Sequence, residues 1–196
     1  MATRSYRQVA RAAAVEDTER QITDALSNLL EQRWFDEITL DDIAAAAGTT
    51  RQTIVRRFGS KTGVLSAMAA QLDCGIRAQR WSTRPTTVQE IVTVLHQDYE
   101  RTGDQVVRTL NQEARIPEFT AVLDRGRRGH REWIEDMFAP WLGELDPKER
   151  MDLMSQLLAV TDVWIWYLLR RAQKHTAKET LKLMIGIVER LLTRNA

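Results

Sequence analysis

The chain is poor in cysteine and has no long apolar segment. Cys74 is its only cysteine, which excludes an intramolecular disulfide framework and fits a reducing compartment. The longest strongly apolar run, residues 163–169, is far shorter than the roughly 20 residues that a membrane-spanning helix needs. The N-terminus contains Arg4, Arg7 and Arg11 and no apolar stretch typical of a secretory signal. We therefore expect a soluble cytoplasmic protein with no membrane partner.

Catalytic and metal-binding motifs are also missing. Cys74 and the three histidines, His96, His130 and His175, are scattered, without the spacing of a zinc site such as H-E-x-x-H or paired C-x-x-C. The phosphate-binding G-x-x-x-x-G-K-[ST] and nucleophilic G-x-S-x-G motifs do not occur. We expect no catalytic residue, no metal and no cofactor. An enzyme is the alternative class, and turnover that depends on one of these four residues would reveal it.

The charge balance of the whole chain does not indicate a partner, but the distribution of charge does. The formal net charge is +1, whereas residues 43–72 contain no acidic residue and four basic ones, Arg51, Arg56, Arg57 and Lys61. A local cationic segment in a nearly neutral chain is typical of a surface that binds nucleic acid. The alternative is the ordinary solvated face of a three-helix module.

The few glycines and prolines lie between segments of helical periodicity, so the sequence predicts an all-α fold. Helix starts are predicted at Thr18 with Gln21, Thr39 with Asp42, Thr50, Ser60, Thr87 with Glu90, Asp104, Pro117, Asp146 with Pro147 and Glu149, and Thr176 with Glu179. The predicted ends are Ala47 for the helix from Leu40, Phe58 for the helix from Arg51, and a position past Met68 for the helix capped by Ser60. The helices that start at Thr87, Pro117, Asp146 and Thr176 are predicted to end near Arg101, Trp141, Ala172 and Thr193. We predict an N-terminal arm with a DNA-binding domain in residues 1–60 and a helical regulatory and dimerisation domain in residues 61–196. The alternative is a boundary near residues 71–75, bridged by the fourth helix without a linker.

Residues 39–58 have the pattern of a helix-turn-helix. A capped helix of about two turns ends at Gly48, which permits a turn with positive φ, and a second short helix follows. Ile54 and Phe58 are expected to anchor that second helix inward. The outward side chains, near the helix N-terminus where base edges are met, are then Arg51, Gln52, Thr53, Arg56 and Arg57.

At these positions the sequence resembles the TetR family of bacterial transcriptional regulators. The residues that carry the resemblance are Ile22, Ala25, Phe35, Thr39, Asp42, Ile43, Ala44, Ala47, Gly48, Thr50, Thr53, Ile54, Phe58, Lys61 and Leu65. The resemblance implies an N-terminal three-helix DNA-binding domain and a C-terminal helical domain for ligand binding and dimerisation. It also implies a repressor that a small molecule releases from its operator. The alternatives are a DNA-binding regulator that needs no ligand, and an activator.

Three positions depart from the family pattern. Trp34 stands where the family usually has glycine, Thr49 replaces a usual valine in the turn, and Val55 replaces a tyrosine that typically contacts a phosphate. The phosphate contact is therefore in doubt here, and Arg56 is the residue that is placed to take it over.

The predicted DNA-binding residues fall into two groups, base contacts and phosphate contacts, according to their side-chain chemistry. Arginine matches guanine and glutamine matches adenine in the major groove, so base contacts are assigned to Arg51, Gln52, Thr53 and Arg57. Phosphate contacts are assigned to Thr39, Thr50, Arg56 and Lys61, two of which also cap helices whose free amides favour an anion. Thr49, in the turn, completes the set. The three N-terminal arginines form either a mobile arm in a neighbouring groove or a solubilising tail.

The expected partner besides DNA is a second copy of the chain, because one short recognition helix gives weak specificity. Two C-terminal helices are apolar on more than one face and are expected to pair with their symmetry mates in a four-helix bundle on a near-palindromic operator. The predicted interface residues are Met154, Leu158, Ile165, Leu168, Met184, Val188 and Leu191. The alternative is that these residues form the core of a monomer.

A third expected partner is a small apolar or aromatic ligand. Five of the six tryptophans follow residue 80, and aromatic residues commonly line apolar pockets. The candidate pocket residues are His96, Tyr99, His130, Trp133, Met137, Phe138 and Trp164. The alternative for each of them is plain helix core.

Overall fold

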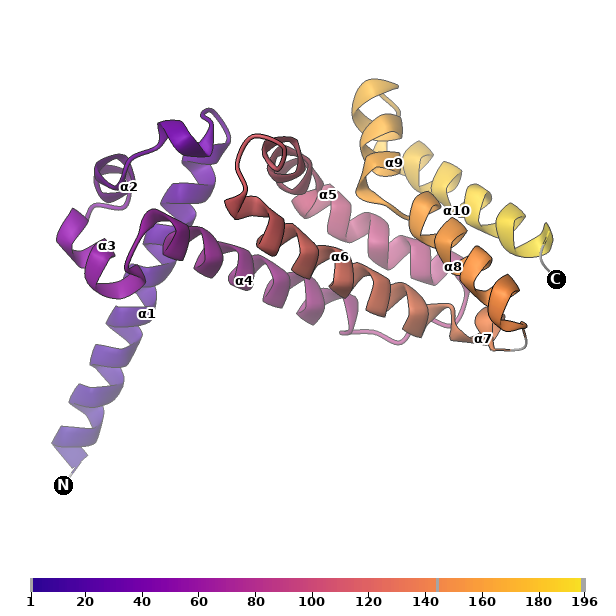
Figure 1. The fold of residues 1–196 in the computed structure, drawn as a ribbon. Helices are drawn as coiled ribbons and strands as arrows, with labels where there is room; N and C mark the ends of the chain where they lie inside the picture. The colour runs from indigo at the N-terminus through magenta and orange to yellow at the C-terminus, as the bar shows by residue number, and fades with distance from the viewer. Residues whose placement is uncertain (1, 144, 195–196) are drawn as a thin grey trace. The chain divides into compact units, whose positions relative to one another are not determined.

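A computed structural model describes residues 2–143 and 145–194, and describes side chains for residues 14–143 and 145–193. Every regular element in this part of the chain is helical (Figure 1). The chain divides into two compact units: Met1–Leu72 together with Ala114–Glu118, and Asp73–Glu113 together with Phe119–Ala196. The division falls inside a helix, after Leu72, at the alternative boundary and not after residue 60.

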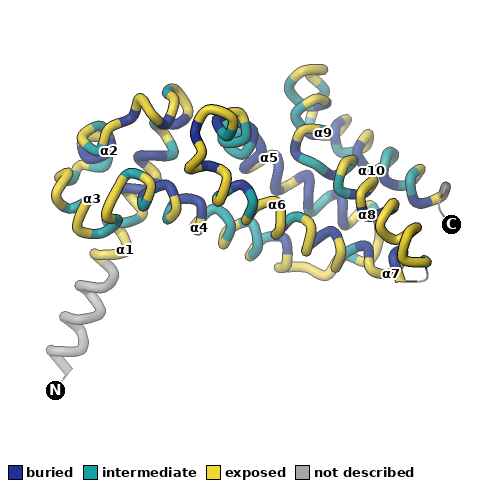
Figure 2. Tube along the Cα trace, viewed as in Figure 1, coloured by how far each residue is buried: buried dark blue, intermediate teal, exposed yellow. Residues whose placement is uncertain are grey.

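The first unit is built from short helices with local stop and start signals. Its elements are α1 (Ala2–Leu30), the 3-10 turn η1 (Phe35–Glu37), α2 (Leu40–Ala46), α3 (Arg51–Phe58) and the first part of α4 (Lys61–Arg80). Their apolar faces meet in one core, in which Ile22, Leu26, Ile38, Ile43, Ile54 and Leu65 are almost completely buried. This core fixes α3 from behind and leaves its outer face in solvent (Figure 2).

The second unit holds the rest of α4 and the longer helices. Its elements are α5 (Val88–Gln112), α6 (Glu118–Met137), α7 (Ala139–Leu142), α8 (Pro147–Val160), α9 (Val163–Tyr167), the π-helical turn η2 (Leu168–Ala172) and α10 (Ala177–Arg194). Buried residues recur along the whole of α5. Three large side chains from other segments are fully buried in the same core: Trp133, Phe138 and Trp166. Helix α5 is therefore the central element of this core (Figure 2).

Most of the predicted helix starts are confirmed by side-chain caps. Thr39 and Asp42 form a capping box on α2, Thr87 and Glu90 form one on α5, and Asp146 and Glu149 form one on α8. Thr50 caps α3. On α10, Thr176 and Glu179 exchange the same pair of hydrogen bonds. Hydrogen bonds between near neighbours set these boundaries, which is why they can be predicted from the sequence.

Three predicted boundaries are wrong because packing overrides local signals. Thr18 does not start α1: its hydroxyl donates to the Ala14 carbonyl at 2.8 Å, one turn back within the same helix. No break occurs near residues 101–104, because α5 is continuous there and Gly103 lies buried against Trp166. A Cβ at residue 103 would come within 2.5 Å of the indole, so the glycine serves close packing.

The predicted single helix from Asp146 to Ala172 is also wrong. It is interrupted after Val160, where Thr161 ends α8 and Asp162 starts α9 by accepting a hydrogen bond from the Trp164 amide at 2.9 Å. A smaller interruption divides the predicted helix from Pro117 to Trp141 into α6 and α7 at Phe138. Both breaks change which side chains face the core.

Candidate nucleic-acid interface and ligand cavity

Helix α2 is fixed at its start by a reciprocal cap. The Thr39 amide donates to the Asp42 carboxylate at 2.8 Å, and the Asp42 amide donates to the Thr39 hydroxyl at 3.1 Å. These hydrogen bonds, together with Arg33 at 3.3 Å, lower the pKa of Asp42 to about 2. The Thr39 side chain, predicted to contact phosphate, is exposed at the start of α2 and is engaged in this cap.

The turn between α2 and α3 has the geometry that the sequence predicts. Gly48 has a φ of 62°, in the left-handed region that favours glycine. The Thr49 amide donates to the Ala44 carbonyl at 2.9 Å, and its side chain is half-buried. The Thr50 hydroxyl then accepts from the Thr53 amide at 3.2 Å and starts α3. The turn therefore aims the first residues of α3 into solvent.

Helix α3 has one buried anchor and a cationic outer face. Ile54 is completely buried and Phe58 is half-buried. On the other side, Arg51, Gln52 and Arg56 are exposed. The Arg51 guanidinium lies 3.4 Å from the Asp41 carboxylate, both well exposed, and such a pair is weak enough to exchange for another partner.

Arg57 does not share this outward position. Its guanidinium donates to the Glu19 carboxylate at 3.0 Å and to the Val15 carbonyl at 3.4 Å, and the side chain is only 16% exposed. Arg57 thus ties α3 to α1 rather than standing beside Arg51 at the free face. This pairing links residues far apart in the sequence, so no local pattern indicates it.

Lys61 is similarly engaged at the start of α4. Its ammonium donates to the carbonyls of Phe35 and Ile38, both at 2.6 Å, and lies 4.3 Å from the centre of the Phe35 ring. Burial lowers the pKa of Lys61. An ammonium has three donors, so one remains for an anion while two hold the segment after α1.

Trp34, the residue that departs from the family pattern, has a partner that the sequence analysis missed. The Arg115 guanidinium lies 4.9 Å from its ring centre and binds the Asp36 carboxylate at 2.7 and 3.1 Å. Arg115 belongs to Ala114–Glu118, the short segment between α5 and α6 that is part of the first unit. The sequence separation is too large for any periodicity to indicate this contact.

The N-terminal arginines cannot be placed in the same way. Arg4, Arg7 and Arg11 lie outside the residues whose side chains the structure describes, so their predicted role as a DNA-contacting arm stays a prediction.

The comparisons with known proteins converge on this part of the chain. The sequence profile described as "Bacterial regulatory proteins, tetR family" matches residues 22–68. A stretch of 51 residues is 45% identical to the HTH-type transcriptional regulator AlkX of Mycobacterium tuberculosis, covering 26% of this chain. Over residues 22–68 the chain is similar to TetR-family regulators. The matched stretch spans about a quarter of the relative's length, 24%.

Solved structures extend the likeness to most of the chain. A TetR-family regulator from Rhodococcus sp. has a TM-score of 0.67 at 13% identity, covering 89% of this chain and 98% of its own. The fatty acid degradation regulator FadR of Bacillus halodurans has a TM-score of 0.64 at 17% identity, covering 87% and 93%. At such low identity the likeness confirms the predicted all-α fold with an N-terminal helix-turn-helix and a C-terminal helical domain.

The second unit contains a cavity of about 510 Å³. Of the predicted pocket residues, Tyr99, His130 and Trp164 lie on its wall. The other four do not: Trp133 and Phe138 are completely buried in the core and Met137 packs against that core. Because their side chains fill the core, they leave no face open to the cavity.

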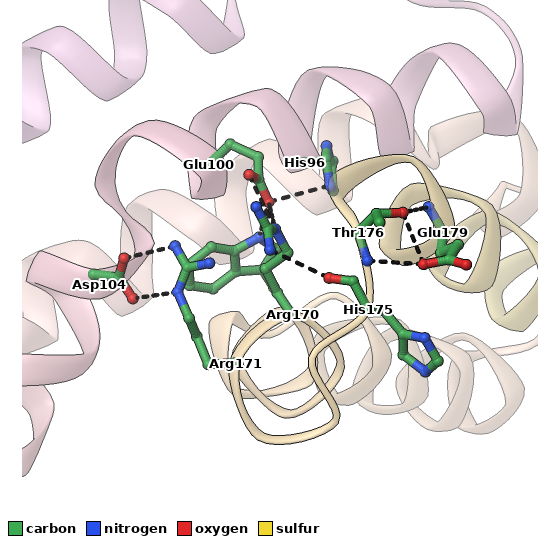
Figure 3. Close-up of polar contacts among 9 residues, drawn as sticks. His96, Glu100, Asp104, Arg170, Arg171, His175, Thr176 and Glu179 are labelled. Carbon is green, nitrogen blue, oxygen red and sulfur yellow. Dashed lines mark hydrogen bonds and ion pairs between the residues drawn. The ribbon is translucent and has the colours of Figure 1, made fainter.

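His96, the fourth, lies beside a different cluster. Its Nε2 atom is 3.5 Å from the Glu100 carboxylate, which also accepts hydrogen bonds from Trp166 at 2.8 Å and from Arg170 at 3.0 Å (Figure 3). Burial lowers the pKa of His96. Arg171 binds Asp104 with two hydrogen bonds in the same view. These pairs fasten η2 to α5, so His96 belongs to the framework of the domain.

The innermost wall of the cavity is a polar network. The Arg80 guanidinium binds the Asp98 carboxylate at 2.7 Å, with both side chains almost completely buried. Its other nitrogen donates to Nδ1 of His130 at 3.2 Å, and Nε2 of His130 lies 3.2 Å from the Thr161 hydroxyl. Burial and the Arg80 charge lower the pKa of His130 to about 3, so the ring is neutral at physiological pH.

The predicted dimer residues divide into two groups. Met154, Met184 and Val188 are buried in the core of the chain itself, which puts them out of reach of a partner, and we remove them from the interface. Leu158, Ile165 and Leu191 are half-buried, and Leu168 is 46% exposed.

Other large apolar side chains of α8, α9 and α10 are exposed as well. Met151, Trp164 and Leu183 lie in solvent, at 62%, 42% and 39% exposure. Exposed apolar side chains of this kind are the candidates for contact with a partner.

Two further searches cover only the described residues. In residues 2–143 and 145–194, no helix is long and apolar enough to cross a membrane. Within the same part of the chain, no three His, Cys, Asp or Glu residues gather closely enough to hold a metal ion.

Proposed function

We propose that this chain is a TetR-family regulator of transcription, a homodimer that binds a near-palindromic DNA operator through α3. The observation that carries the proposal is the exposed, cationic start of α3, held by the Thr50 cap and the buried Ile54 behind it. A helix of this size with arginine and glutamine at its N-terminal end fits the major groove. The match of residues 22–68 to the TetR family model supports the same function.

The structure refines the proposed roles of the contact residues. We assign base contacts to Arg51, Gln52 and Thr53 at the start of α3, because arginine and glutamine match guanine and adenine edges. Arg57 becomes a residue that orients α3, since Glu19 holds it.

Phosphate contacts are proposed for Arg56, which is exposed beside Val55, and for the free donor of Lys61. Thr39, Thr49 and Thr50 flank the helix N-termini, where exposed amides attract an anion.

Dimerisation is proposed through the outer faces of α8 to α10. Two copies then present two α3 helices about 34–36 Å apart or a multiple of it, one for each half-site. The exposed Met151, Leu168 and Leu183 supply apolar contact area, together with the half-buried Leu158, Ile165 and Leu191.

Regulation is proposed through the cavity of the second unit, as a repressor that a small molecule releases. Its volume lies within the range of pockets that bind small organic ligands. The ligand must favour the non-binding arrangement by a coupling of typically about 1–3 kcal/mol.

Selection of bound DNA from a random pool, at stated salt, tests the proposal. We expect an inverted repeat whose half-sites lie about one helical turn apart or a multiple of it. Recovery of unrelated sequences, with no enrichment over the starting pool, contradicts the proposed function. The salt concentration must be fixed because phosphate contacts dominate affinity and weaken steeply with salt.

A further inference from the structure

The cavity of the second unit has apolar side walls contributed by several helices. Ile76 comes from α4, Val106 and Leu110 from α5, Leu123 from α6 and Leu158 from α8. Trp164 of α9 closes the wall beside them. These side chains offer no charge, so the body of an occupant in contact with them is apolar.

The buried polar network of Arg80, Asp98 and His130 does not require a charged group on the ligand. Arg80 and Asp98 neutralise each other, and His130 accepts from Arg80 while its other nitrogen meets Thr161. A second anion beside Asp98, or a cation beside Arg80, would lie unpaired in a buried site and cost free energy. The inner end of an occupant is therefore uncharged.

The exposed part of the lining is different, because it is rich in arginine. Arg127, Arg128 and Arg131 of α6 line the cavity and are exposed. Arg127 is bound to Glu113 and Asp124. Among the residues that the structure describes, neither Arg128 nor Arg131 has an acidic partner within 4.0 Å. Arg128 and Arg131 are thus exposed lining residues whose charge no carboxylate of the described residues neutralises.

Two glycines keep this side of α6 open. A Cβ at Gly126 would meet nothing within 4 Å, whereas one at Gly129 would lie 3.2 Å from the Arg77 guanidinium. Glycine inside a helix is unfavourable relative to alanine. Their occurrence between the arginines leaves space where side chains would otherwise narrow the opening.

From these observations we propose that the cavity binds a small amphipathic anion, with an apolar body between α4, α5, α6 and α8 and its acidic group at Arg128 and Arg131. Planar guanidinium groups bind carboxylate and similar oxyanions with two parallel hydrogen bonds. This inference rests on the proposed ligand-controlled function and specifies the chemistry of the ligand.

A pair of fluorescent probes with the same aromatic body tests the inference on the full chain. One probe is 1-anilinonaphthalene-8-sulfonate, and the other is N-phenyl-1-naphthylamine, which lacks the sulfonate. We expect the sulfonate probe to bind at one site per chain and more tightly than the neutral probe. Arg128→Gln and Arg131→Gln should each weaken its binding by about 3- to 10-fold and leave the neutral probe unchanged.

The matched control is Arg125→Gln, which removes the same charge from an exposed position of α6 outside the cavity lining. A second control, Gly126→Leu, puts a side chain at the opening with a residue that favours helix, and should reduce binding of both probes. Equal affinity for the two probes, or an equal effect of Arg125→Gln and Arg128→Gln, overturns the inference. So does unchanged binding of both probes to the Gly126→Leu variant.

Failure of this inference is separable from failure of the proposed function. A chain that selects an inverted repeat from random DNA but prefers the neutral probe is a regulator with a different ligand. A chain that binds the sulfonate probe through Arg128 and Arg131 but enriches no DNA sequence refutes the proposed function alone.

Discussion

Arg51 and Arg57 lie at the two ends of one short helix, yet they have different surroundings. Arg51 is well exposed and weakly paired with Asp41, whereas Arg57 is mostly covered and bound to Glu19. The same side-chain chemistry therefore serves two purposes. An arginine that changes partners easily can read a base, and one that is already satisfied holds the helix in place.

Replacing Arg51 with alanine should relax base preference at one position of each half-site. One bidentate arginine–guanine pair gives about 1–3 kcal/mol of discrimination. The measurement is competition binding against operators changed one base pair at a time. Arg56→Ala is the comparison, because loss of a phosphate contact weakens all sequences alike and lowers the salt slope. An Arg51 variant with unchanged base preference would show that this residue does not read the operator.

Asp42 gives the α2 cap a pH dependence. Its pKa falls from 3.8 to about 2 in the folded chain, chiefly because the Thr39 amide and hydroxyl hydrogen-bond to the carboxylate. A lowered pKa stabilises the fold at pH values above 3.8, and this stabilisation disappears as pH falls through about 2.

Urea unfolding of the wild type and the Asp42→Asn variant over this pH range measures the effect. The difference between their unfolding midpoints should shrink as pH falls from above 3.8 toward 2. Other carboxylates titrate in both proteins and cancel. A midpoint difference that stays constant over the range would contradict the role of the ionised carboxylate.

At the scale of elements, the interruptions between helices position the functional side chains. The break at Thr161 and Asp162 separates α8 from α9 and lets Trp164 line the cavity while Trp166 enters the core. The π-helical turn η2 is held by Arg170 and Arg171 against α5 (Figure 3). A continuous helix would rotate these side chains to other faces.

The Asp162 cap should therefore contribute measurably to stability. Asp162→Ala removes the acceptor for the Trp164 amide, and loss of an N-cap typically costs about 0.5–2 kcal/mol. Asp162→Asn keeps an acceptor of similar capping strength and serves as the control. Urea denaturation compares the three proteins. Equal destabilisation by both substitutions would assign the effect to lost charge instead of the cap.

At the scale of the whole molecule, the proposed activity needs two copies of the chain. The apolar residues left in solvent on α8, α9, η2 and α10 are the surface that a second copy would cover. Met184 and Val188, on the same last helix, already serve the core of the single chain. Helix α10 thus has one face in the core of the chain and another, with Leu183, that is proposed for the dimer.

A charge on the outer face of α10 should dissociate the dimer without unfolding the chain. Leu183→Glu places a carboxylate at a position that is 39% exposed in the single chain, so folding tolerates it, whereas a dimer would bury it unpaired. Thr193→Glu adds the same charge at another exposed position of α10 and should leave the dimer intact. Sedimentation equilibrium measures the mass. Unchanged mass of the Leu183→Glu protein would place the interface elsewhere.

The sequence supports prediction of the DNA-binding head far better than prediction of the cavity. The caps at Thr39 and Thr50, the positive φ of Gly48 and the burial of Ile54 are all confirmed, because each depends on neighbours within one or two turns. For the second unit the same reasoning placed Trp133 on the cavity wall, whereas it is completely buried in the core. The number of aromatic residues indicates a large apolar domain, but it does not indicate which of them line the cavity.

The all-α class, the resemblance of residues 22–68 to TetR-family regulators and the start of most helices can be read from the sequence alone, since hydrogen bonds and hydrophobic periodicity act over a few residues. The pairing of Arg57 with Glu19, the contact of Arg115 with Trp34 and the arginines of α6 that line the cavity are visible only in the folded chain. The physical reason is distance along the chain. A pairing between residues from separate helices exists only after those helices pack, and no local pattern encodes it.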